Sequence, residues 1–285
     1  MLVNTLSLLR QARAKGYAIG AFNTSDLEIS QGIIEAAVEL RSPVILQTSE
    51  KAIEYAGLKT LVAMLISLAE EAPIPVAIHL DHGRSVEIAL QAIEAGFTSV
   101  MIDTSKDSYA KNVEQVQAVV KVAHKQQIAV EAELGSITGK EDYIEALKSR
   151  LTDPDQAAEF VELTGCDSLA VSIGNAHGKP NATEIFDLDR LRLIASKVKI
   201  PLVLHGASST HPARISAAIQ AGIAKINIDT DVRLAFSGEL REFLARHPEA
   251  YDPREYLGSA REAVRKLVLH RIDQFGSANQ GGHHA

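Results

Sequence analysis

Short apolar runs alternate along the chain with longer amphipathic segments, and the alternation repeats eight times. Each run is rich in Val, Ile, Leu and Ala, whereas the segments between them carry apolar residues at helical spacing. A polar loop is expected at 136–152. The predicted strands are residues 18–23, 43–49, 76–81, 99–103, 128–133, 168–173, 201–205 and 224–229. The predicted helices are residues 4–16, 25–40, 58–72, 85–95, 107–126, 154–164, 187–197, 210–221, 231–246 and 258–275.

Eight strand–helix units in about 250 residues predict an α/β fold, a single (β/α)8 TIM barrel. We expect it to span residues 1–276, with an extra N-terminal helix and a C-terminal helical extension. Little polar alternation within several strands is typical of parallel strands that are buried on both faces. An open doubly wound sheet is the alternative, but no glycine-rich dinucleotide turn follows the first strand. We expect residues 277–285 to form a disordered tail.

Composition narrows the class of protein. A chain of 285 residues with 46% hydrophobic content can bury one sizeable core. A net charge of -7 without a long basic run argues against a nucleic-acid partner. There is no run of about 18 apolar residues and no signal-peptide pattern, so we expect no membrane span. The single Cys166 excludes an intrachain disulfide and fits a reducing cytoplasm.

Polar residues gather at the predicted carboxyl ends of the strands, where barrels of this kind carry their chemistry. Three apolar runs lead into a His-Gly pair, at His82, His177 and His205. Three imidazoles at equivalent strand ends predict a divalent metal site, and an open fourth position would match catalytic zinc. Cobalt and iron remain alternatives. The other polar residues at these ends are Asn23, Ser49, Asp81, Asp103, Glu133, Asn227 and Asp229.

Charged residues beside these histidines have two interpretations each. Asp81 either orients an imidazole or acts as a general acid/base, and we expect its side chain to diverge from that of its neighbour His82. Glu131 and Glu133 alternate on one strand, so both can face the barrel interior and support the metal site or contact the metal. His79, three residues before His82, is expected to point to the other face of its strand.

Three further segments are candidates for binding. The segment 135–142 has the glycine hinges and charges of a mobile lid. Segments 206–209 and 227–230 follow the last two strands, where such barrels often hold a phosphate against backbone amides and a helix N-terminus. Lys179 could add charge there. Lys225 raises the alternative of a Schiff base, which a metal site would make redundant.

The stretches His-Leu-Asp-His-Gly, Glu-Ala-Glu-Leu-Gly, Val-Leu-His-Gly-Ala-Ser and Lys-Ile-Asn-Ile-Asp-Thr-Asp together resemble class II, zinc-dependent fructose-bisphosphate aldolases and the related tagatose-bisphosphate aldolases. The resemblance runs from Gly20 to Arg254. It implies a lyase of glycolysis that reversibly cleaves fructose-1,6-bisphosphate to dihydroxyacetone phosphate and glyceraldehyde 3-phosphate. Tagatose-1,6-bisphosphate, its C4 epimer, and other ketose phosphates remain alternative substrates.

The resemblance also implies roles for individual residues. His82, His177 and His205 look like the ligands of one Zn²⁺, and Glu133 resembles an alternative ligand. Asp81 looks like the acid/base for the C4 hydroxyl proton, and Glu141 in the lid like the group that moves the proton at carbon. Arg254 resembles an arginine lent to a neighbouring subunit, which implies a homodimer or a homotetramer. The candidate substrate and phosphate contacts are Asn23, Gly178, Lys179, Gly206, Ser208, Asn227, Asp229 and Thr230.

The chain departs from the family pattern in two places. Lys179-Pro180 follow His177-Gly178 at once, where the family commonly has a longer stretch. This shortening bears on the Lys179 contact and on the monovalent cation, Na⁺ or K⁺, that family members often use. Lys140 stands where an acidic residue is common. Two other functions remain open: a different metal-dependent barrel, such as a hydrolase or isomerase, and a non-catalytic barrel that regulates a partner aldolase.

Overall fold

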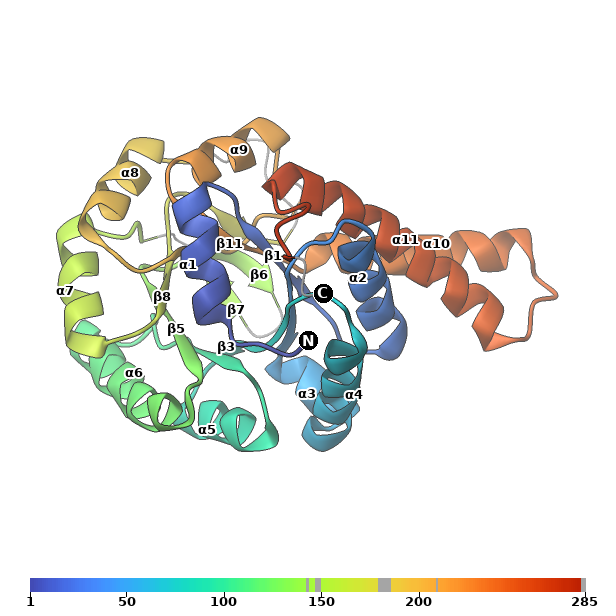
Figure 1. Cartoon of the computed structure of the whole chain (residues 1–285), viewed down its shortest axis with the longest axis horizontal. Coiled ribbons are helices and arrows are strands. Elements are labelled where there is room, and N and C mark those ends of the chain that lie inside the picture. The colour runs from blue at the N-terminus through green and yellow to red at the C-terminus, as the bar shows by residue number, and fades with distance from the viewer. Residues whose placement is uncertain (142–143, 147–149, 179–185, 209, 283–285) are drawn as a thin grey trace.

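A closed barrel of eight parallel strands forms the centre of the molecule (Figure 1). The computed structural model describes residues 1–141, 144–146, 150–178, 186–208 and 210–282, with the backbone alone described at 138–141, 144–146 and 177. The strand order is β1-β11-β10-β8-β5-β4-β3-β2, so the predicted TIM barrel is confirmed. The strands are β1 (Ile19–Asn23), β2 (Val44–Ser49), β3 (Val76–Gly83), β4 (Ser99–Ile102), β5 (Ala129–Leu134), β8 (Ser168–Val171), β10 (Leu202–Leu204) and β11 (Ile223–Ile228).

Helices surround this barrel, and their ends follow the capping signals of the sequence. Asp153 accepts hydrogen bonds from two backbone amides at the start of α7, and Pro154 takes the first helical position. Gly96 ends α5 with a φ of 107°, as predicted. The helices are α1 (Thr5–Lys15), α2 (Leu27–Glu39), α3 (Glu50–Ala56), α4 (Leu58–Glu71), α5 (Val86–Ala95), α6 (Tyr109–Ala123), α7 (Pro154–Thr164), α8 (Leu188–Lys197), α9 (Pro212–Gln220), α10 (Thr230–Arg246) and α11 (Pro253–Phe275).

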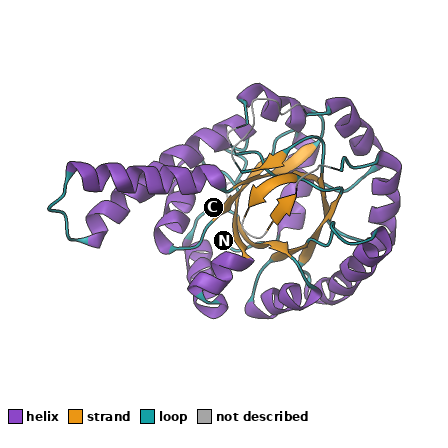
Figure 2. Cartoon of the chain, turned by 180° about the vertical axis from the view of Figure 1, so that it is seen from behind, coloured by secondary structure: helices purple, strands orange, loops and turns teal. Residues whose placement is uncertain are grey.

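Side chains alternate along each strand between the helical layer and the barrel interior. On β3, Ile78 and Leu80 pack in the large core that the strands share with the surrounding helices. Ala77 instead belongs to a smaller apolar cluster that α1 closes at one end of the barrel. The inward row continues with His79 and Asp81, which are also buried. Figure 1 looks onto the end covered by α1, and Figure 2 onto the opposite end, where the strands finish.

The structure corrects the expectation of a polar loop at 136–152. Part of that segment forms an antiparallel hairpin of β6 (Thr138–Glu141) and β7 (Ile144–Ala146). β6 also pairs in parallel with β9 (Ala176–His177), which gives a small sheet separate from the barrel. Helix α3 was not predicted either, although Ser49 caps it through its side chain. Seven residues are too few to show a clear helical period.

The expected disordered tail is wrong for residues 277–282. Ser277 is fully buried and its Oγ lies 2.9 Å from the Oγ of Ser42. The backbone amide of Asn279 donates to the carbonyl of Leu40 at 2.8 Å. Residues 283–285 lie outside the described part of the chain.

Helices α10 and α11 project together from the barrel as an arm (Figure 1). Along α10 only Asp231 and Val232 are buried, and Leu234 and Leu244 are exposed. The inner part of α11 packs on α2 and returns the chain to the barrel. Among the described residues, no helix taken singly is long and apolar enough to span a membrane. The bent pair α3 and α4 would pass by length and composition.

Candidate metal centre and active site

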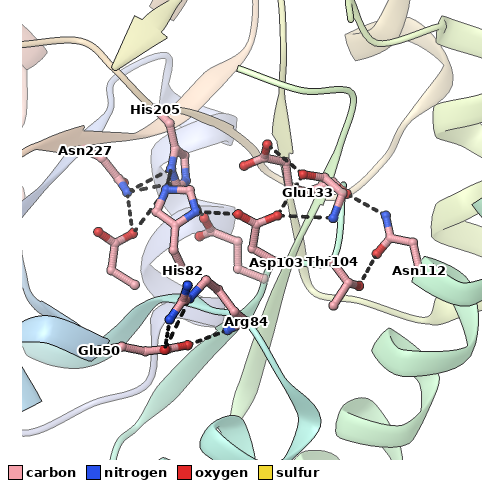
Figure 3. Close-up of polar contacts among 12 residues, drawn as sticks. Glu50, His82, Arg84, Asp103, Thr104, Asn112, Glu133, His205 and Asn227 are labelled. Atoms are coloured by element: carbon pink, nitrogen blue, oxygen red, sulfur yellow. Dashed lines mark hydrogen bonds and ion pairs between the residues drawn. The ribbon is translucent and has the colours of Figure 1, made fainter. Parts of the chain in front are cut away.

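Two of the predicted ligand histidines face each other inside the carboxyl end of the barrel (Figure 3). His82 lies on β3, His205 directly follows β10, and both are buried. Nε2 of His82 is 2.9 Å from Nδ1 of His205. The opposite nitrogens meet carboxylates: Nδ1 of His82 lies 2.8 Å from Asp103, and Nε2 of His205 lies 2.8 Å from Glu131. Because a carboxylate accepts hydrogen bonds, each ring directs an N–H outward and its other nitrogen towards its partner.

This geometry suits a cation between the two rings. Two nitrogen lone pairs at 2.9 Å repel each other unless they share a proton or a metal ion. Burial acts to lower the pKa of His82, but the carboxylates of Asp81 and Asp103 outweigh it and raise that pKa to about 10. The potential ligand atoms of Asp81, His82 and His205 all lie within 4.8 Å of one another. The residues therefore fit a divalent metal held by imidazoles whose orientation carboxylates fix.

A left-handed turn of the backbone places His82 in this cluster. His82 has a φ of 48°, and the register between β3 and β4 shifts between Leu80 and Gly83. Strict alternation would send Asp81 and His82 to opposite faces, but Nε2 of His82 lies 4.0 Å from Oδ1 of Asp81. The expected divergence of these neighbours is therefore wrong. Gly83 permits the turn, because a Cβ there would lie 2.6 Å from the carbonyl oxygen of Met101.

Three side-chain amides hold the buried carboxylate of Asp81. Asn23 donates to Oδ2 at 2.8 Å, and Asn227 donates to Oδ1 at 3.1 Å. Gln47 donates to Oδ2 at 3.3 Å and also to the side-chain oxygen of Asn23 at 2.5 Å. Neutral donors orient both oxygens without neutralising their charge. Asp81 is thereby fixed beside the imidazoles as a group that can accept a proton.

A second group of possible ligands lies on the other side of His82. Ligand atoms of His82, Asp103 and Glu133 lie within 4.8 Å of one another. Glu133 accepts a hydrogen bond from Ser105 through Oε1, and its buried Oε2 has no hydrogen-bond partner among the described residues. Burial, together with the charge of Asp103, holds the pKa of Glu133 well above its usual value. A cation near this carboxylate would relieve both effects, which fits the predicted alternative ligand.

Deeper in the barrel, Glu131 joins three basic side chains. Its Oε1 lies 2.8 Å from Nε2 of His205, and its Oε2 lies 2.9 Å from Nζ of Lys225 and 3.8 Å from Nε2 of His79. His79 therefore points into the barrel, so the expectation that it faces away from the site is wrong. His79 and Asp81 are two residues apart on β3, so their side chains point to the same side of the strand. The expectation assumed strict alternation from His79 to His82, which the left-handed conformation of His82 interrupts.

The segment that carries the predicted lid lies beside the third predicted ligand. In the pairing of β6 with β9, Gly139 stands opposite His177. Glu141 is two residues further along β6, although the side chains of Glu141 and His177 lie outside what the structure describes. Gly178 has a φ of 86°, and Lys179 falls outside the described residues. The backbone thus brings the predicted lid beside the segment of His177, and the positions of the Glu141 carboxylate and the His177 imidazole are not described.

One of the two predicted phosphate segments, 227–230, reaches a small pocket through Asp229. Helix α10 begins at Thr230, and its N-terminus offers backbone amides and a partial positive charge. Nε of Arg233 donates to Asp229 at 2.6 Å, and Oγ of Ser208 accepts from the backbone amide of Asp231 at 3.4 Å. Ser209 lies outside the described residues. The pocket residues are Asn23, Thr24, Ser25, Ile29, Ser49, Ala52, Asp229 and Arg233.

Arg254 lies apart from the other predicted residues. It is the second residue of α11, which begins at the far end of the arm (Figure 1). Its side chain is 90% exposed, and its guanidinium pairs with Asp252 in the same turn. Within its own chain Arg254 therefore stays on the arm and away from the barrel opening.

Comparisons with known proteins agree with this geometry. The family model described as fructose-bisphosphate aldolase class-II matches residues 3–280. The chain belongs to the class II fructose-bisphosphate aldolase family. It is 47% identical to a fructose-bisphosphate aldolase of Thermus caldophilus, over 98% of this chain and all of the relative. It is 40% identical to one of Giardia intestinalis, over 96% of this chain and 93% of that protein. The YdjI aldolase structure from Escherichia coli K12 matches with a TM-score of 0.88 at 37% identity, covering 99% of this chain and all of that one.

Several residues that shape this class II aldolase site were not singled out from the sequence. Gln47 lies within an apolar run, and its even spacing from Ser49 was the only signal that it faces inward. Asp103 was noted as a polar strand end but was not assigned to His82. Arg233 stands four residues after Asp229, a helical spacing at which an ion pair forms readily. These pairings depend on which strands are neighbours, which local pattern does not reveal.

Proposed function

We propose that the chain is a metal-dependent aldolase that reversibly cleaves fructose-1,6-bisphosphate to dihydroxyacetone phosphate and glyceraldehyde 3-phosphate. The observation that carries this proposal is Asp81, held by three amides at the edge of a cluster of facing imidazoles. A retro-aldol reaction needs a base for a hydroxyl proton next to an electrophilic centre that stabilises an enediolate. The site supplies a fixed carboxylate and a place for a cation within a few ångströms of each other.

Zn²⁺ is the metal we propose, with His82, His205 and His177 as its ligands and Glu133 as an alternative. The outward N–H groups of His82 and His205 meet Asp103 and Glu131, which leaves the inward nitrogens for the metal. When bound, the metal acts as a Lewis acid on the oxygen atoms of the ketose. We expect His205→Ala to lose stoichiometric metal. Full zinc content in that variant, measured on folded protein, would contradict the ligand assignment.

Asp81 takes the proton of the C4 hydroxyl during cleavage and returns it during synthesis. Asn23 and Asn227 aim its two oxygens, so the carboxylate needs no rearrangement to accept the proton. Glu141 moves the proton at the carbon of dihydroxyacetone phosphate. The pairing of β6 with β9 supports this role, because it brings the strand of Glu141 beside that of His177.

The phosphate groups bind where backbone amides and cations converge. Thr230 at the start of α10, Ser208 and Gly206 suit one phosphate, together with Gly178, Asn227 and Asp229. Arg233 adds a guanidinium at the rim of the pocket beside Asn23. Lys179 and a monovalent cation, Na⁺ or K⁺, complete the proposed contacts.

The protein acts as a homodimer or homotetramer in which the arm of α10 and α11 reaches a neighbouring subunit. The exposed leucines of α10 and the exposed Tyr251 near the tip of the arm support an interface there. Arg254 then binds the distal phosphate of the substrate in the neighbouring subunit, since it lies away from the active site of its own chain. A single buried cysteine is compatible with the cytoplasm, where glycolysis takes place.

The test is release of triose phosphate from fructose-1,6-bisphosphate and tagatose-1,6-bisphosphate, each measured with and without EDTA. We expect faster cleavage of the fructose substrate and loss of activity with EDTA that zinc restores. Cleavage that survives complete removal of metal would overturn the metal-dependent mechanism. Faster cleavage of tagatose-1,6-bisphosphate would reassign the substrate while leaving the chemistry in place.

A further inference from the structure

A buried ion pair inside the barrel has no part in the proton transfers proposed above. Lys225 and Glu131 have side chains that are 0% and 2% exposed, and their charged atoms are 2.9 Å apart. They come from β11 and β5, which are not neighbours in the barrel. A buried pair of this kind costs desolvation and is often no more stabilising than apolar residues of the same volume. Its presence below the imidazoles therefore calls for a reason other than stability.

Glu131 connects this pair to the metal centre. One carboxylate oxygen meets Lys225, and the other receives the N–H of His205 at 2.8 Å. Burial acts to raise the pKa of Glu131, but Lys225 and His205 outweigh it and hold that pKa below its usual range. The hydrogen bond to Glu131 fixes which nitrogen of His205 carries the proton. It thereby turns Nδ1 towards His82, 2.9 Å away.

Lys225 cannot reach a substrate from this position. Its side chain is 0% exposed, and Lys225 lies on β11 two residues before Asn227, further from the carboxyl end of the strand than the amide that contacts Asp81. A Schiff base would require a substrate carbonyl to reach this amine, which lies 2.9 Å from the carboxylate of Glu131. The alternative role suggested by the sequence is therefore not supported.

We propose that Lys225 and Glu131 form a positioning pair for the metal centre. The ammonium group of Lys225 holds Glu131 in place, and Glu131 holds His205 in the orientation that presents Nδ1 to the metal. This inference rests on the metal site of the proposed function. It assigns the pair to metal affinity and geometry and not to any contact with the substrate.

The proposal is tested by measuring the metal affinity of purified protein that has been stripped of metal and reconstituted with Zn²⁺ or Co²⁺. We expect Lys225→Met to bind Zn²⁺ about 10- to 100-fold more weakly in competition with a chromophoric chelator, the usual effect of losing a partner of a metal ligand. The visible spectrum of the Co²⁺-loaded variant should also change, because the geometry around the ion is altered. Wild-type affinity together with an unchanged Co²⁺ spectrum would overturn the proposal.

A paired variant keeps the test decisive if Lys225→Met alone fails to fold. Glu131→Gln combined with Lys225→Met removes both charges at nearly constant volume, so the metal-free fold should survive. Its zinc affinity should still fall about 10- to 100-fold, since an amide is a weaker acceptor than a carboxylate. Wild-type zinc affinity in this double variant would overturn the proposal.

A matched control is the buried ion pair of Asp231 with Arg271, whose side chains are 10% and 8% exposed. Asp231→Asn combined with Arg271→Met also removes two buried charges, but away from the imidazoles. It should leave zinc affinity and the Co²⁺ spectrum unchanged, and an equal loss in this control would assign the effect to general destabilisation and overturn the proposal. If the wild-type protein itself held no zinc, the proposed function would fail first, and the two failures are thus distinguishable.

Discussion

The two ends of the barrel interior are built from the same strands with opposite chemistry. At the amino end, Ile19, Ile45 and Ala77 pack against Leu9 of α1 in a closed apolar cluster. At the carboxyl end, the same inward rows continue as amides, carboxylates and imidazoles. On β3 the change occurs within two residues, from Ala77 to His79. One end therefore contributes packing free energy. The other holds buried polar groups, many of which hydrogen-bond to one another, while some, such as Oε2 of Glu133, have no hydrogen-bond partner among the described residues.

Burial alone does not separate structural from functional residues in this barrel. Every residue of β3 is buried, including the catalytic candidate Asp81 and the ligand candidate His82. The two ends differ in what the buried side chains contact. At the amino end they contact apolar side chains, and at the carboxyl end they contact hydrogen-bonding groups from neighbouring strands. Substitutions at the carboxyl end should therefore affect turnover more than stability, and substitutions at the amino end should do the reverse.

The largest expected effect is on turnover in Asp81→Ala. Loss of a positioned acid/base should lower kcat by about 10²- to 10⁴-fold, with zinc still bound. The amides of Asn23, Gln47 and Asn227 lose their acceptor, so the free energy of unfolding should fall by only about 1–3 kcal/mol. Steady-state kinetics, metal analysis and urea unfolding of the same preparation measure all three.

The control for this prediction is Asp187→Ala. Asp187 caps α8 by accepting from the backbone amide of Arg190, and its side chain is 38% exposed. Its loss should cost about 1 kcal/mol of stability and leave kcat unchanged. Full activity of Asp81→Ala would remove the acid/base role. A drop in kcat of similar size in both variants would mean that turnover follows stability at both positions.

At the amino end, Leu9→Ala should show the opposite signature. Leu9 is 1% exposed in the apolar cluster below the site. Truncating it should lower the free energy of unfolding by about 2–5 kcal/mol, through lost transfer energy and the cavity left behind. The folded fraction should retain wild-type kcat and zinc content. A loss of kcat in fully folded Leu9→Ala would show that the two ends are coupled.

The division between the ends was only partly visible in the sequence. Periodicity and strand composition were enough for the barrel, because each strand–helix unit carries its own pattern. The sequence predicted that Asp81, His82 and His205 lie close together, because strand ends meet at one edge of a closed sheet. The inward position of His79 was not found, because parity was counted from His82, whose φ of 48° interrupts the alternation.

Contacts between distant segments account for the rest. Gln47 touches Asn23 and Asp81 only because β1, β2 and β3 are neighbours in a particular register. The link from Lys225 to Glu131 spans the barrel interior, so no local spacing predicts it. Order in residues 277–282 likewise depends on backbone hydrogen bonds to Leu40 and Arg41, which a glycine-rich composition conceals.

A smaller effect is expected from pH at Cys166, which is buried just before β8 at the amino end. Burial raises the pKa of its thiol to about 12 from the usual 9.0. Above pH 9 the thiol ionises in the unfolded chain but not in the folded one, so stability is lost as the pH rises from 9 towards 12. At pH 10 the loss is about 1.4 kcal/mol from this group.

Urea unfolding at pH 8 and pH 10, for the wild type and Cys166→Ala, isolates the contribution of the thiol. The wild type should lose about 1.4 kcal/mol more than the variant between the two pH values, since other alkaline groups are common to both. In the native wild type the thiol should also resist alkylation at pH 8. Equal pH dependence in the two proteins would contradict the buried, protonated thiol.

The smallest expected effect lies at the rim of the carboxyl end, where Arg84 meets Glu50 (Figure 3). The guanidinium donates to Oε2 at 2.8 and 3.2 Å, and the backbone amide of Arg84 donates to Oε1 at 2.7 Å. The Arg84 side chain is 43% exposed, so water screens the pair, and the backbone bond survives in Arg84→Met. The free energy of unfolding should fall by less than about 1 kcal/mol.

Arg84→Met also tests whether the exposed rim of the barrel affects zinc binding and turnover. Arg84 follows Gly83 directly and is two residues from His82. If the ion pair of Arg84 with Glu50 determined the left-handed conformation of His82, its loss would disturb the metal site. Yet Gly83 is already held by the backbone bond from Asp103 to its carbonyl at 2.7 Å, and His82 by the carboxylate of Asp103 at 2.8 Å. Zinc affinity and kcat should therefore stay near wild type. A tenfold loss of zinc in this variant would extend the critical region from the buried interior to the exposed rim.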